Sequence, residues 1–155
     1  MTAAAGGAGS GPWAGLDPGL HKCGLVLSDA TGTQILAAGV LGPEACWEQL
    51  RQWRQQERVR AVVLGDGTGS GPWRQRLAAL AVPLILVPEA GTTLEARRRF
   101  WQLEPPRGWR RLLPEGMRLP PRDYDDVVAQ LLLERHLGQA LRRERCSWIK
   151  KPPAP

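Results

Sequence analysis

The stretch Pro88-Glu89-Ala90-Gly91-Thr92-Thr93-Leu94-Glu95-Ala96-Arg97 places a carboxylate where a strand gives way to a helix. Residues 82–87, directly before it, are apolar and predict a strand. Thr92 and Glu95 have the Thr-x-x-Glu spacing of a capping box, which predicts a helix N-terminus. We therefore expect Glu89 at the carboxyl edge of a sheet, where open α/β sheets usually hold their sites.

The remaining sequence predicts a mixed α/β domain. A short turn at 29–32 joins two strand-like segments, which predicts an antiparallel hairpin. Strands are expected at 14–17, 23–28, 33–41, 61–64 and 83–87, and helices at 43–58, 72–81, 93–103 and 123–145, the last capped by Asp123. Residues 104–122 show no periodicity and predict a loop. The fold class expected is α/β, with a five-stranded mixed sheet, its first three strands antiparallel, flanked by helices on both faces.

The length of 155 residues and the hydrophobic content of 43% indicate one domain with a real core. We expect this domain to span 14–146. An Ala/Gly-rich lead at 1–13 is predicted to be disordered, and a basic, Pro-rich tail at 147–155 is predicted to be loose.

The three cysteines, Cys23, Cys46 and Cys146, are widely spaced and form no zinc-binding pattern. They also suggest no disulfide framework, so a reducing compartment is favoured. The first residues lack the basic start and apolar run of a secretory signal, and no segment approaches the ~20 apolar residues of a membrane span. These features predict a cytoplasmic protein with no membrane partner.

Three acids from distant parts of the chain are candidates for one metal site. Asp17 ends the first strand in Leu16-Asp17-Pro18-Gly19, Glu89 follows the fifth strand, and Asp125 shares a helix side with Val128, Ala129 and Leu132. An acid in an apolar setting is costly to bury unless it is paired or metal-bound. Divalent Mg²⁺, or Mn²⁺, prefers such carboxylate oxygens.

Each acid also has a purely structural interpretation. Asp17 can be a turn acid before Pro-Gly, and Glu89 can favour the dipole of the nearby helix. Asp126 is a further candidate metal ligand, or else a first-turn partner of the last helix dipole. Asp66, after the fourth strand, lies in a Gly-rich segment, 65–71, which lacks the Gly-Lys-Ser/Thr ending of a P-loop.

The net charge of +6 favours a polyanionic partner, nucleic acid first. Arginine can pair with phosphates while an aromatic ring stacks on an unpaired base. The alternative is a solvated face whose tryptophans anchor the loop to the core. The candidate nucleic-acid-binding residues are Arg97, Arg98, Arg107, Trp109, Arg110, Arg111 and Arg118.

Three motifs together resemble a known family. Gly15-Leu16-Asp17-Pro18-Gly19, with Gly24 beyond it, resembles the first-strand motif of RuvC-type resolvases and their YqgF relatives. The segment 89–97 resembles the YqgF "Asp-Glu-Arg-Leu-Thr-Thr-x-Glu-Ala" sequence, although Pro88, Ala90 and Gly91 depart from it. Residues 125–129 resemble the start of the last YqgF helix. The resemblance spans about 14–138 and implies a ribonuclease H-like fold.

The resemblance also implies a function. It suggests a divalent-metal-dependent nuclease that hydrolyses phosphodiester bonds in structured nucleic acid, with precursor ribosomal RNA as the favoured substrate and with Asp17, Glu89 and Asp125 as catalytic, metal-holding residues. A RuvC-type Holliday junction resolvase acting on branched DNA is one alternative, and it would require a homodimer. A non-catalytic nucleic-acid-binding module of the same fold is another. Both a monomer and a homodimer remain open.

Overall fold

A computed structural model describes residues 10–150 of the chain. Its strands are β1 (Trp13–Asp17), β2 (Cys23–Ser28), β3 (Ile35–Leu41), β4 (Ala61–Gly65), β5 (Leu84–Val87) and β6 (Ser147–Trp148). Its α-helices are α1 (Pro43–Gln55), α2 (Ser70–Ala78), α3 (Thr92–Leu103) and α4 (Asp125–Leu137). Two 3₁₀ helices, η1 (Gly108–Leu112) and η2 (Glu115–Met117), lie between α3 and α4. None of the helices in this described part of the chain is long and apolar enough to cross a membrane.

The strands form one mixed sheet in the order β5-β4-β1-β2-β3-β6. The β1–β2 and β2–β3 pairs are antiparallel, while β4 pairs parallel with β1 and β5 parallel with β4. The predicted mixed sheet with its antiparallel start is confirmed. The order and directions of β1 to β5 are those of the ribonuclease H-like fold.

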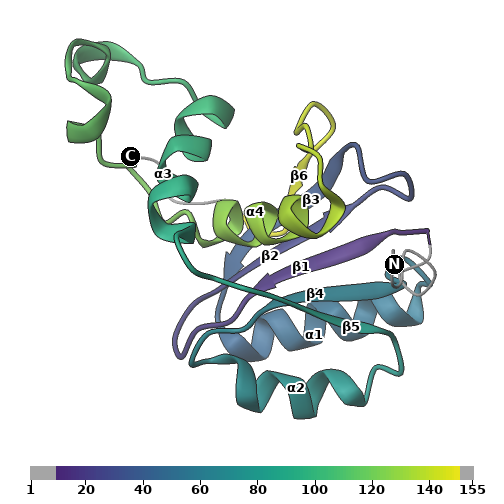
Figure 1. Ribbon diagram of the computed structural model, residues 1–155. Helices are drawn as coiled ribbons and strands as arrows, with labels where there is room; N and C mark the ends of the chain where they lie inside the picture. The colour runs from purple at the N-terminus through teal and green to yellow at the C-terminus, as the bar shows by residue number, and fades with distance from the viewer. Residues whose placement is uncertain (1–9, 151–155) are drawn as a thin grey trace, which may run out of the picture.

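Helices cover both faces of the sheet, as predicted (Figure 1). On one face, alternate residues of the strands pack against the buried α1 residues Cys46, Leu50 and Trp53 and against α2. On the other face, Val26 and Val63 pack against Leu132 and Leu133 of α4. The core is therefore two apolar layers separated by the sheet, with α3 stacked on the outer side of α4.

Two glycines bring α4 unusually close to the sheet. A Cβ at Gly15 of β1 would overlap the carbonyl oxygen of Ala129, and a Cβ at Gly24 of β2 would overlap that of Asp125. A helix backbone can approach a strand this closely only where no side chain intervenes. The first turn of α4 is thereby pressed against the end of the β1–β2 hairpin.

The segment between α3 and α4, residues 104–122, is named the arm here. It projects beyond the sheet with the two 3₁₀ helices in it (Figure 1), where the sequence predicted an irregular loop. Trp109, Leu112 and Met117 of the arm are 63%, 86% and 66% exposed. The arm is therefore a surface feature and not part of the core.

Several expected helix ends were wrong. Helix α1 ends at Gln55 and not at 58, and α2 spans Ser70–Ala78 and not 72–81. The N-cap of α3 is Gly91, with φ of 76°, which has no side chain to serve as a cap. The Thr92 hydroxyl, expected to cap the helix, donates backwards to the Glu89 carbonyl at 2.7 Å. Asp123 does not cap α4, which begins at Asp125. This helix ends at Leu137, well before residue 145, since Gly138 takes up a left-handed φ of 72°.

The sheet also has one more strand than expected. Ser147 and Trp148 pair with Ala37 and Ala38 of β3, and the Ile149 amide continues the contact with the Ala38 carbonyl at 2.9 Å. The start of the predicted loose tail thus extends the sheet by β6. Residues 1–9 of the predicted lead at 1–13, and the predicted tail from residue 151, lie outside the described residues. Trp13, the last residue of that lead, is buried and begins β1.

Candidate active site

A pocket of about 940 Å³ opens at the carboxyl edge of the sheet. The three acids selected from the sequence all line it: Asp17 at the end of β1, Glu89 just past β5, and Asp125 at the start of α4. Asp17 and Glu89 are neighbours there because β1, β4 and β5 run parallel, so their carboxyl ends share one edge. Asp125 reaches the same place from the face covered by α4.

Asp17 has the most perturbed environment of the three acids. Burial, followed by the negative charges of Asp125 and Glu89, raises its pKa from 3.8 to about 7. The charges of Asp125 and Glu89 thus act on Asp17 within the pocket that all three residues line. An acid with this pKa, in a pocket and beside other acids, is a candidate for a functional site.

Glu89 lies over the end of β4, where glycines leave room for it. A Cβ at Gly65 or at Gly67 would overlap the carboxylate of Glu89. The backbone N–H of Glu89 donates to Asp66 at 3.0 Å, so Asp66 fixes the turn on which Glu89 sits. Burial raises the pKa of Glu89 against the opposing hydrogen bond from the Gly67 amide, and the charge of Asp66 raises it further.

Asp125 is held by the close approach of α4 to Gly24. Burial raises its pKa, while the positive charge of Lys22 opposes that shift. Lys22 itself pairs with Asp123 at 2.9 Å, and both of these side chains are more than half exposed. An exposed pair of this kind is worth about 0–1 kcal/mol, so a ligand can replace it readily.

The donor set fits a hard divalent cation. Oε1 of Glu89 is buried and has no hydrogen-bond partner, and the charges of Glu89 and Asp125 both raise the pKa of Asp17. A cation would supply the missing partner and relieve the repulsion. Across residues 10–150, however, no three side chains of His, Cys, Asp or Glu already surround one point as a metal cage does. The acids share the pocket but do not form a closed cage.

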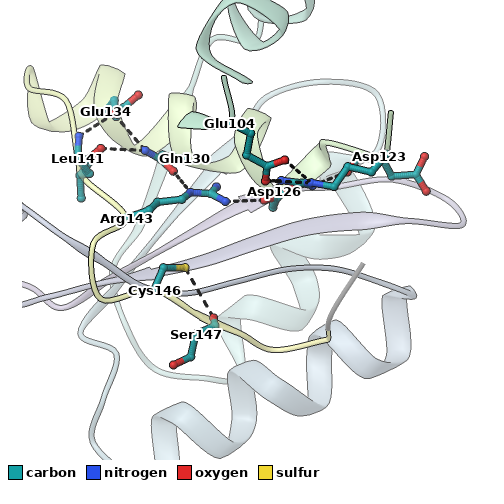
Figure 2. A network of polar contacts seen from close by, with 10 residues as sticks. Glu104, Asp123, Asp126, Gln130, Glu134, Leu141, Arg143, Cys146 and Ser147 are labelled. Atoms are coloured by element: carbon teal, nitrogen blue, oxygen red, sulfur yellow. Dashed lines mark hydrogen bonds and ion pairs between the residues drawn. The ribbon is translucent and has the colours of Figure 1, made fainter. Parts of the chain in front are cut away.

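Asp126 lies in a different environment. Its carboxylate is fully buried and pairs with Arg122 and with Arg143, each at 2.8 Å. Burial alone would raise its pKa, but these two arginines hold the pKa below its usual range. Figure 2 shows Arg143 between Asp126 and Gln130, with Glu104 next to Asp126. With both of its oxygens already paired to arginines, Asp126 is a structural acid.

Some of the predicted basic residues are available to a ligand, in the pocket or on the surface, and one is bound within the arm. Arg97 lines the pocket with the acids, Arg98 lies on the exposed side of α3, and Arg107 and Arg111 are exposed on the arm. The Arg118 guanidinium instead donates to backbone carbonyls of the arm, to that of Arg110 at 3.0 Å and to that of Arg111 at 3.3 Å. Its role in the structure is to hold the arm together.

Trp109 is exposed on the arm, and the Arg110 guanidinium lies 4.9 Å from the centre of its ring. The ring is therefore on the surface, with the Arg110 guanidinium over one of its faces. Sequence reasoning missed Lys22, which reaches the pocket from the β1–β2 hairpin. The sequence did contain a signal for Lys22: it follows Asp17 by five residues, in a turn that brings the two side chains to the same edge of the sheet.

Comparisons with known proteins give structural neighbours but no sequence match. No protein-family model matches the chain, and no curated protein matches its sequence. The chain is similar in structure to T. thermophilus RuvC in complex with Holliday junction substrate, with 16% identity, a TM-score of 0.49, and coverage of 91% of this chain and 98% of that one. It is also similar to a second Thermus thermophilus RuvC structure, with 16% identity, a TM-score of 0.44, and coverage of 91% and 99%.

Proposed function

We propose that this chain is a divalent-metal-dependent nuclease that hydrolyses phosphodiester bonds in structured nucleic acid, with precursor ribosomal RNA as the first substrate to test. One observation supports this above the others. Asp17, Glu89 and Asp125, from three separate parts of the chain, line one pocket that Arg97 also lines. Acidic and basic groups are both needed where a cation and a phosphate meet.

Asp17, Glu89 and Asp125 are the residues that would hold the cation, which when bound polarises a phosphoryl oxygen and makes water a better nucleophile. Because the pKa of Asp17 is about 7, binding a cation at neutral pH displaces a proton from this carboxyl group. In the hydrolysis, the oxygen of water bonds to phosphorus, one phosphorus–oxygen ester bond breaks, and the leaving oxygen takes up a proton.

The basic residues of the pocket have a separate task. Arg97 presents a planar guanidinium, which can pair with two phosphate oxygens at once. Lys22 can exchange its weak pairing with Asp123 for a phosphate oxygen. Together they would hold the strand so that the scissile phosphate faces the carboxylates, which is the positioning part of catalysis.

The test is cleavage by Asp17→Asn, a change that removes charge but little volume. We expect Mg²⁺-dependent cleavage to be abolished while RNA binding and folding persist. Glu48→Gln is the matched control, because Glu48 is an exposed acid of α1, which packs on the opposite face of the sheet, and it should cleave like the unaltered protein. Equal cleavage by Asp17→Asn would reject the assigned site.

The substrate is tested with a panel of precursor ribosomal RNA, single strands, duplex and a four-way DNA junction, with and without Mg²⁺. Preferred cleavage of the RNA supports the proposal as stated. Preferred cleavage of the junction would assign the same site to a resolvase. Tight binding without cleavage of any member would leave a nucleic-acid-binding module and refute the nuclease.

A further inference from the structure

Three hollows meet where α3 and the arm join. The candidate active-site pocket shares Pro121 with a second pocket of about 350 Å³. A third hollow of about 150 Å³ shares Arg97 with the first and Trp101 with the second. The three hollows therefore adjoin one another, with Pro121, Arg97 and Trp101 as the residues that they share.

The second pocket has aromatic and aliphatic walls. Phe100, Trp101 and Leu103 of α3 line it, and Arg107 and Arg110 of the arm line the side toward solvent. Its volume is at the lower end of the range found for small-molecule sites, about 300–1,000 Å³. A flat, uncharged ring is a suitable occupant, provided that it is attached to something negative that the two arginines can pair with.

The walls of this pocket are fixed by their own contacts. Phe100 is fully buried and meets Trp101 edge to face, with ring centres 4.9 Å apart and an interplanar angle of 83°. The Arg122 guanidinium lies 5.2 Å from the centre of the Phe100 ring. Glu104, which also lines the pocket, is neutralised by its 2.8 Å pair with Arg122 and does not repel an anionic chain.

The arm is fastened to α3 and to itself by hydrogen bonds. The Trp101 indole N–H donates to the Arg118 carbonyl at 3.2 Å, and the Arg118 guanidinium donates back to the arm at Arg110 and Arg111. The site thus exists before a ligand arrives, so little conformational entropy is lost when one binds.

We propose that this second pocket binds one unpaired nucleobase of the substrate strand, so that cleavage occurs beside unpaired nucleotides. This inference rests on the proposed function, since it names the substrate class for the same site. Apolar aromatic walls suit the face of a base, and Arg107 and Arg110 suit the phosphates on either side of it. Pro121 lines both pockets, so a strand that passes over it reaches this pocket and the acids together.

The experiment measures binding in EDTA, so that it does not depend on cleavage. A single-stranded oligonucleotide is compared with an abasic strand of the same length and charge. We expect the abasic strand to bind about tenfold more weakly, since stacking of one base on an aromatic side chain is worth about 1–3 kcal/mol. Equal binding of the two strands would overturn the proposal.

Two variants assign the base preference to the pocket. Leu103→Trp fills the pocket and should abolish the preference for bases over abasic sites. Gln102→Trp is the control, because Gln102 is the exposed neighbour on α3 and does not line the pocket. A preference that Leu103→Trp leaves intact, or that Trp109→Ala alone removes, would place the base elsewhere and refute the pocket.

A measurement on the unaltered protein avoids any folding defect of the variants. A strand carrying 5-iodouracil should photo-crosslink to Trp101, the aromatic residue of the pocket that is not fully buried, identified by mass spectrometry. Crosslinks confined to Trp109 would contradict the pocket. The two proposals fail separately: metal-dependent cleavage without a base preference rejects the pocket alone, and a base preference without cleavage rejects the nuclease alone.

Discussion

Replacing Asp17 by Asn should make the metal-free protein more stable, and more so as the pH rises. In the folded chain Asp17 holds its proton up to about pH 7, whereas its ordinary pKa is 3.8. Between these values folding takes up a proton, so the free energy of unfolding falls as the pH rises from about 4 through about 7. Asn has no proton to lose and escapes this penalty.

The size of the effect follows from the pKa difference. The rise from 3.8 to about 7 corresponds to at most about 4 kcal/mol above pH 7, at about 1.4 kcal/mol per pKa unit. At about pH 5 it is roughly 1.5 kcal/mol, and below pH 3.8 it vanishes. For a chain of 155 residues, 1 kcal/mol shifts Tm by about 2–4 °C, so the variant should melt about 5–15 °C higher at pH 8.

The assay is thermal and urea unfolding in EDTA at acidic and mildly alkaline pH, repeated with excess Mg²⁺. Mg²⁺ should stabilise the unaltered protein and leave Asp17→Asn nearly unchanged, because a ligand that binds the folded state stabilises it. Glu48→Gln, on the exposed side of α1, should show neither effect. A gain in stability that is the same at both pH values, or absent at pH 8, would refute the reasoning about the pocket.

Two further substitutions test the supports of the site. Gly24→Ala should lower both the free energy of unfolding and the cleavage rate, because the added Cβ overlaps the backbone of Asp125. Gly71→Ala is the control, because Gly71 has open space around it and the change should alter neither quantity. Urea unfolding and the cleavage assay measure the two effects. Asp126→Asn should cost about 3–5 kcal/mol in urea unfolding, since it leaves the largely buried Arg143 without its anion and Arg122 with Glu104 alone. A loss below about 1 kcal/mol would contradict the structural role.

Most of the sheet could be predicted from local pattern. The turn at 29–32 and the apolar runs on both sides of it specify the hairpin of β2 and β3, and the short apolar run of β4 is typical of a strand buried on both faces. β6 could not be predicted, because Ser147 and Trp148 form a strand through pairing with β3, more than one hundred residues away in the chain.

Helix ends were predicted less well, for reasons that the contacts explain. The Thr92 hydroxyl could have bonded forward into the helix or backward to Glu89, and spacing alone does not choose between them. Gly138 was visible in the sequence as a stop signal, and the apolar periodicity before it was wrongly extended past it. Asp126 was placed among the ligands because its arginine partners, Arg122 and Arg143, are brought to it only by the folded arm and C-terminal segment.

Glycines around the site allow its three acids to lie in one pocket. In the sheet order, β4 lies between β1 and β5, so the carboxyl end of β4 separates Asp17 from Glu89. Gly65 and Gly67 at that end leave open the space that the Glu89 carboxylate occupies, while Gly24 leaves open the space for the backbone of Asp125. A methyl group at any of these positions would push an acid out of the pocket. The glycines therefore belong to the site as much as the carboxylates do, because they determine whether the negative charges share one space.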